Sequence, residues 1–215
     1  MPAPDPQRLG GLAWAQRTKG RLTAAERRHL LGSIAAALGS YAAGRIRATT
    51  GRVPPRARDL SAAALTPPDS RLARTAEDAC REQPPALIGH GYRTWMFGAG
   101  LATVDGLTLD PELFYVASLL HDYGLSQPVD GEDFTLRSVG RLQRCADDAG
   151  MAPATVDQAA DAITVHAGPG VTVERDGALG VYVQAGGMFD LAGMRLGDLS
   201  RAYRDDVINA HPARV

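Results

Sequence analysis

The sequence predicts an all-α fold, a helical bundle preceded by an N-terminal helical arm. Residues that favour helix starts recur along the chain, and apolar residues follow them at the three- and four-residue spacing of one helix face. No series of alternating strand segments is present. The one stretch that alternates in this way, 171–177, is compatible with either a short hairpin arm or a loop.

The first 69 residues are predicted to be a tail, a helical arm and a proline-rich connector. Thr23 and Glu26 have the spacing of a capping box, and the Ala/Leu-rich sequence after them indicates a helix of about four turns that ends at Gly44. Residues 45–70 contain four prolines among small polar residues, so we expect a connector with one helical turn at 59–65.

Residues 70–215 are predicted to form the main helical domain. Asp110-Pro111-Glu112 is the strongest start signal, with Asp as N-cap, Pro at the first helical position and Glu in the first turn. Glycines end several segments, and Asp198 is expected to cap the last helix. The expected helices are 70–82, 86–104, 110–123, 134–149, 153–166, 178–192 and 199–209.

Composition narrows the class of protein. The chain of 215 residues has 23 basic and 24 acidic residues, a balance that argues against a dedicated nucleic-acid binder. No apolar run approaches the ~20 residues of a membrane span, and the N-terminus lacks the pattern of a signal peptide. We therefore expect a cytoplasmic protein that acts on a small molecule. The arginine-rich segments 17–28 and 45–58 are compatible with a solvated face, a dimer arm of a homo-oligomer or a lid.

Three of the five histidines lie in predicted core helices, whereas His29 and His211 are interpreted as solvated surface residues. His121-Asp122 ends a strongly apolar helix, which favours an interior position for the pair, although a bare HD dipeptide is also common at helix ends.

A second histidine and a second aspartate raise the probability of a metal site. His90 lies beside apolar residues in another helix, and Asp190 follows two glycines that indicate close helix packing. Together with His121 and Asp122 they would form a set of two nitrogen and two oxygen ligands from three helices. Such a set suits one divalent transition-metal ion, Zn²⁺ or Fe²⁺ first and Mn²⁺ or Ni²⁺ as alternatives.

Four segments extend this pattern, namely HGYRTWMFG, DPELFYVASLLHDYGL, AITVHAG and VQAGGMFDLAG. In this order they resemble the HD-domain superfamily of metal-dependent hydrolases, and they look similar to the branch that contains cyanamide hydratase. The resemblance covers about residues 70–205. It implies that His90, His121, Asp122 and Asp190 are metal ligands, and that His166 lies near the site or binds a second metal ion.

The resemblance also implies catalytic roles. Asp122 is expected to act as general base and His166 to shuttle a proton. Arg93, one turn after His90, would either orient a substrate or pair with an acid. Aromatic residues beside the motifs, Phe134 among them, are interpreted mainly as core.

Two departures from the family pattern affect the expected reaction. Thr135 stands where relatives often carry a glutamate, and the segment after Gly124 lacks the lysine of many phosphohydrolases. We expect a hydrolase or hydratase that acts on a small polar electrophile such as a nitrile or cyanamide. A phosphohydrolase acting on a nucleotide or phosphoester is the alternative. A di-iron oxygenase is disfavoured because only His166 lies between the HD pair and Asp190, and a non-catalytic module is disfavoured by the complete ligand set.

Overall fold

The computed structural model describes residues 8–212, and within that range it contains helices, turns and loops but no strand. The predicted all-α fold is therefore confirmed. The segment that alternates like a strand is neither a hairpin nor a plain loop. It contains the short helix α8 (Val173–Asp176), whose first turn is capped by the side chain of Thr172, which accepts a hydrogen bond from the Arg175 N–H.

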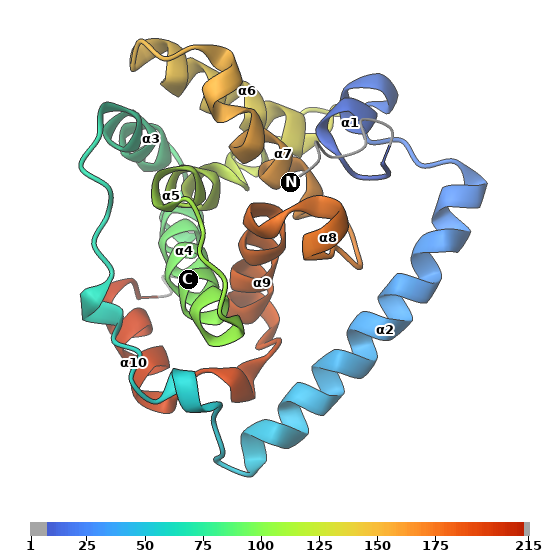
Figure 1. The fold of residues 1–215 in the computed structure, drawn as a ribbon. Coiled ribbons are helices and arrows are strands. Elements are labelled where there is room, and N and C mark those ends of the chain that lie inside the picture. The colour runs from blue at the N-terminus through green and yellow to red at the C-terminus, as the bar shows by residue number, and fades with distance from the viewer. Residues whose placement is uncertain (1–7, 213–215) are drawn as a thin grey trace.

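Two antiparallel helices, α4 (Pro85–Asp105) and α9 (Ala178–Ala192), cross the middle of the molecule (Figure 1). They pack with α5 (Pro111–Leu120) and α7 (Asp157–Val165), while α3 (Arg71–Arg81) and α6 (Phe134–Asp148) lie against α5 and each other. The core between these helices consists of buried apolar side chains, including Leu101, Tyr115, Leu120, Ile163 and Val183.

Most helix boundaries lie within two residues of the predicted ones, but the predicted start at residue 153 is wrong, because a 3-10 helix (Pro153–Val156) precedes α7. The side chains of Ser70 and Asp110 accept hydrogen bonds from backbone N–H groups in the first turns of α3 and α5, as the sequence indicates. Helix α5 ends at Leu120 rather than Tyr123, and a short 3-10 helix (Tyr123–Leu125) follows. The prediction that Asp198 caps the last helix is wrong. Helix α10 (Arg201–Ala210) is capped by Ser200, because Asp198 belongs to the preceding 3-10 helix (Leu196–Asp198).

The connector between the arm and the domain has two short 3-10 helices, Pro55–Ala57 and Ala62–Ala64. The second lies within the predicted turn at 59–65. Within residues 8–212, no helix combines the length and the apolar character needed to cross a membrane.

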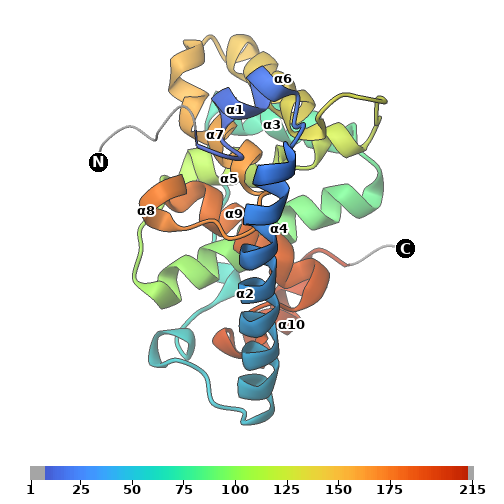
Figure 2. The ribbon, with the colours of Figure 1, turned by 90° about the vertical axis from the view of Figure 1, so that its right-hand side faces the viewer.

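The N-terminal arm consists of α1 (Leu12–Thr18), which packs on α7, and the long helix α2 (Ala24–Thr49), which runs along the outside of the molecule (Figure 2). The predicted capping box is present, with the Glu26 N–H donating to Thr23 Oγ1 at 3.2 Å. The predicted end at Gly44 is wrong. Gly44 is buried within the helix beside the backbone of Arg195, where an added Cβ would make ordinary contact at 3.4 Å.

Buried ion pairs join the start of the chain to the domain. Arg8 donates through Nε to Asp176 at 3.0 Å and also pairs with Asp161, and the backbone N–H of Leu12 donates to Asp161 at 3.1 Å. The side chain of Arg8 is almost completely buried. Because a buried carboxylate without a partner is costly, these contacts hold Arg8 and Leu12 against α7 and α8.

The contact between α4 and α9 depends on glycine. An added Cβ at Gly186 would overlap the backbone oxygen of Thr94, and one at Gly98 would overlap the backbone oxygen of Tyr182. The two backbones therefore approach each other more closely than any larger residue permits. The sequence indicated close packing near Asp190 from the two adjacent glycines, and the structure confirms it at Gly186.

Gly186 and Gly187 allow a test of this contact. Gly186→Ala should lower the free energy of unfolding by about 2–3 kcal/mol, because the new methyl group meets backbone that cannot move aside. Gly187→Ala places its methyl group 3.7 Å from its nearest neighbours, so it should be neutral or should gain up to ~1 kcal/mol of helix propensity. Urea unfolding of both variants in a chelating buffer measures the difference. Equal stabilities would contradict the proposed close contact.

Candidate metal centre

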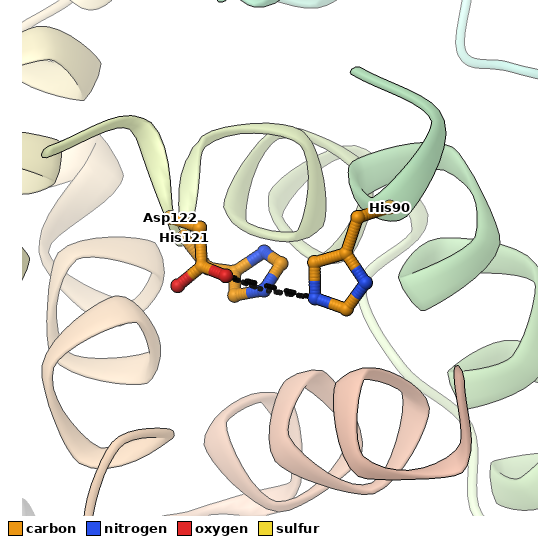
Figure 3. A group of neighbouring side chains, drawn as sticks. All are labelled: His90, His121 and Asp122. Carbon is orange, nitrogen blue, oxygen red and sulfur yellow. Dashed lines mark hydrogen bonds and ion pairs between the residues drawn. The ribbon is translucent and has the colours of Figure 1, made fainter. Parts of the chain in front are cut away.

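His90, His121 and Asp122 reach one point in the interior from two helices (Figure 3). His90 lies in α4, and His121 is the C-cap residue that directly follows Leu120, the last residue of α5. Residues 113–120 of α5 are buried, so the end of this helix carries His121 and Asp122 into the protein. Both histidines are almost completely buried, and Asp122 is partly accessible.

The donor atoms of this group lie close together. His90 Nε2 is 3.2 Å from His121 Nε2, and Asp122 Oδ2 lies 3.6 Å from the first nitrogen and 3.4 Å from the second. Two imidazole nitrogens and a carboxylate oxygen are common ligands of zinc, iron and related ions. The three residues therefore form a group that could hold a metal ion.

The opposite ring nitrogen of each histidine has a hydrogen-bond acceptor. His90 Nδ1 lies 2.7 Å from Asp190 Oδ2, and His121 Nδ1 lies 2.7 Å from the Ser118 carbonyl oxygen. Neither acceptor can donate when Asp190 is ionised, so each Nδ1 carries a proton and donates it. The two Nε2 atoms face each other at 3.2 Å and are the nitrogens that can bind a shared cation.

His166 lies at the edge of the same group. It is the C-cap residue directly after α7. Its Nδ1 donates to the Ile163 carbonyl oxygen, and its Nε2 lies 3.5 Å from Asp122 Oδ1. Its ring meets the ring of His121 edge-on, with centroids 4.8 Å apart. Asp122 therefore has one carboxylate oxygen directed toward the His90–His121 pair and the other toward His166.

Asp190, the fourth predicted ligand, lies one imidazole ring away from the other donors. It bonds to His90 Nδ1, and it accepts two hydrogen bonds from Arg93, at 2.7 Å from Nε and 2.9 Å from Nη2. In this arrangement Asp190 orients His90 instead of joining the group at Nε2. Arg93 pairs with an acid, one of the two roles considered for it, and a contact with substrate remains a prediction.

The electrostatic environment keeps the two carboxyl groups ionised. Burial opposes ionisation of Asp122, but its hydrogen bonds and electrostatic interactions with His121 and His166 outweigh burial and hold its pKa well below the usual range. Burial likewise opposes ionisation of Asp190, whose pKa is held low by His90 and Arg93. Burial lowers the pKa of His166, with Asp122 opposing the shift, so this imidazole is neutral at neutral pH.

Of two further residues beside the group, Thr94 was not identified from the sequence, and Gly187 was noted only as a sign of close helix packing. Thr94 Oγ1 is buried without a hydrogen-bond partner among residues 8–212, and an added Cβ at Gly187 would lie 3.7 Å from that oxygen and from both Nε2 atoms. Thr94 follows His90 by four residues and so shares its helix face, which was the available signal. Gly187 leaves open space beside the histidine nitrogens.

The interpretation of His211 as a solvated residue is wrong. Its ring stacks on Tyr92 with centroids 4.5 Å apart, and its carbonyl oxygen accepts a hydrogen bond from Arg93 Nη1 at 3.0 Å. Burial lowers the pKa of this imidazole. The end of α10 therefore helps to fix Arg93, a contact that no local pattern in the sequence could indicate. His29 is exposed, as predicted.

Comparison with known protein families found no family model that matches the chain, and no curated protein matches it either. The resemblance to HD-domain hydrolases therefore depends on the motif residues themselves.

Arg93→Met tests the ion pair that holds Asp190. The substitution leaves a buried carboxylate with only His90 as a partner, so the free energy of unfolding at pH 7 should fall by about 3 kcal/mol. Arg201→Met is the matched control, because Arg201 pairs with Asp205 on the surface and should cost less than about 1 kcal/mol. Chemical denaturation measures both variants, and a similar small cost for the two would show that the Arg93–Asp190 pair contributes no special stability.

Proposed function

We propose that this protein is a metal-dependent hydrolase or hydratase of the HD-domain type, in which His90, His121 and Asp122 hold a divalent transition-metal ion. The substrate would be a small molecule with an electrophilic centre, such as a nitrile or cyanamide-like group. The observation that carries the proposal is the convergence of two imidazole nitrogens and a carboxylate oxygen on one point.

The surroundings of these residues fit a cation. Each histidine is fixed through Nδ1 by a hydrogen-bond acceptor, which is the usual arrangement of metal-binding histidines. Thr94 supplies a buried hydroxyl oxygen that has no partner among the described residues and lies beside the same open space. Asp190, paired with Arg93, holds His90 at its far nitrogen and does not occupy the space between the Nε2 atoms.

A divalent ion bound there supplies Lewis acidity and lowers the pKa of a water molecule from 15.7 toward about 7. The residues of the chain provide the remaining functions. Asp190 and Ser118 fix the two histidine rings, and His166, neutral because it is buried, can accept a proton at Nε2. Asp122 Oδ1 faces that nitrogen at 3.5 Å, so a proton can pass between the two groups.

Metal content provides the first test. Wild-type protein purified without chelators or an affinity tag that binds metal should contain about one equivalent of Zn, Fe, Mn or Ni by elemental analysis. Asp122→Asn should lose at least about tenfold in metal affinity, because the amide is a much weaker ligand than a carboxylate. Asp205→Asn, on the surface of α10, is the matched control. Metal-free wild-type protein that takes up no ion on titration would refute the metal centre, and two equivalents would make His166 a ligand.

His166→Asn separates proton transfer from metal binding. Because His166 lies beside Asp122 and outside the three-residue group, the variant should keep one equivalent of metal. Its turnover should fall by about 10²–10⁴ on any substrate found among nitriles, cyanamide and phosphoesters, since it removes the proton acceptor. Unchanged turnover would exclude the proposed role of His166. Selective hydrolysis of phosphoesters would favour the phosphohydrolase alternative.

A further inference from the structure

A cavity of about 780 Å³ lies between the N-terminal arm and the domain. Three segments surround it: residues 8–30 of the arm, residues 125–135 after the HD motif, and residues 164–175 after α7. The arm forms one wall because Arg8 and Leu12 attach it to Asp161 and Asp176. Figure 2 shows α1 in front of α6 and α7, both of which it contacts.

The cavity is lined mainly by apolar side chains. Trp14 and Leu22 face it from the arm, and Phe134, Val165 and Pro169 face it from the domain. Its size falls in the range of about 300–1,000 Å³ that is typical of sites for organic ligands. A nitrile of a few atoms would leave most of this space to water, at ~30 Å³ per molecule, against apolar walls.

Charged side chains in the lining leave an excess of positive charge at one end. Arg8 and Arg175 are paired with aspartates, and Glu132 is paired with Arg137 outside the lining. Lys19 and Arg21 line the cavity and have no ion-pair partner among the residues that the structure describes.

One carboxylate of the lining offsets part of this charge. Asp133 lies against Gly20, between the two cations in sequence, and its Oδ1 accepts hydrogen bonds from the backbone N–H and the hydroxyl of Thr135. Two cations therefore face one carboxylate that already caps α6, which favours an anionic group of a ligand at this end.

Part of the cavity wall lies next to His166, although none of the candidate site residues His90, His121, Asp122 and His166 lines the cavity itself. Val165 and Ala167, the neighbours of His166 in the chain, both line the cavity. The ring of Phe134, another lining residue, meets the ring of His166 edge-on with centroids 6.0 Å apart. A molecule that fills the cavity therefore contacts Phe134, beside His166, and also lies near Lys19 and Arg21.

We propose that this cavity is the substrate chamber, and that it accepts a molecule with an apolar, aromatic-sized body and an anionic group held by Lys19 and Arg21. The proposal rests on the proposed hydrolase function and specifies its substrate class. The electrophilic group of that molecule reaches the His166 side, and residues 8–30 serve as the wall that excludes water from its apolar body.

Anilinonaphthalene sulfonate, an apolar aromatic anion, is a direct probe of the chamber. It should bind metal-free protein with about one equivalent, and Leu22→Asp should weaken binding by about tenfold or more because a carboxylate then lies in the apolar wall. Leu38→Asp is the matched control, since Leu38 is 63% exposed on α2 outside the cavity, and its effect should stay below about twofold. Circular dichroism confirms that both variants remain folded. Unchanged binding in Leu22→Asp, or an equal loss in Leu38→Asp, overturns the proposal.

A neutral analogue tests the anion requirement. The double variant Lys19→Gln/Arg21→Gln should weaken anilinonaphthalene sulfonate by about tenfold and leave the uncharged N-phenylnaphthylamine within about twofold. A similar change for both probes, or for neither, overturns the assignment of the anionic end to these two residues.

Protein loaded with Mn²⁺ connects the chamber to the metal centre. The proton resonances of bound anilinonaphthalene sulfonate should broaden in the Mn²⁺ form and not in a Zn²⁺ control. Binding without broadening shows that the cavity is not the chamber of this site. If Mn²⁺ does not bind while the probe still does, the hydrolase proposal fails and the cavity remains a binding site for apolar anions.

Discussion

The close approach of α4 and α9 is the contact on which the candidate site depends. Gly98 and Gly186 let the backbones meet where a larger residue would overlap backbone atoms. Because the helices are this near, Asp190 on α9 reaches both His90 and Arg93 on α4. The same approach places Gly187 beside the histidine nitrogens and leaves open space there. A packing constraint thus determines the orientation of the donor atoms.

That orientation has an electrostatic consequence. Acceptors at Nδ1 leave the Nε2 atoms of His90 and His121 facing each other, and Asp122 adds a carboxylate that stays ionised. Burying a carboxylate and two imidazoles in the interior is costly unless their interactions compensate for the lost hydration. A core selected only for stability would favour apolar residues at these positions. A bound metal ion would offset the free-energy cost of burying these polar groups.

The sequence predicted the fold class, most helix starts and the group of His90, His121 and Asp122, because caps and helical spacing are local signals. Some boundaries were missed. Gly44 resembles a stop signal, but α2 continues through it to Thr49. The position of Asp190 on the far nitrogen of His90, and the contact between His211 and Arg93, depend on the packing of helices that no local pattern specifies.

The N-terminal arm is the clearest case of a feature that emerges only from tertiary structure. Its residues carry no recognisable motif, and the sequence left its role open between a solvated face, a dimer arm and a lid. The buried pairs of Arg8 with Asp161 and Asp176 place the arm against α7, the helix that ends at His166. A partly open, largely apolar cavity then lies between the arm and the domain. The arm therefore has a physical reason to remain in place even though Leu31 and Leu38 of α2 are both largely exposed.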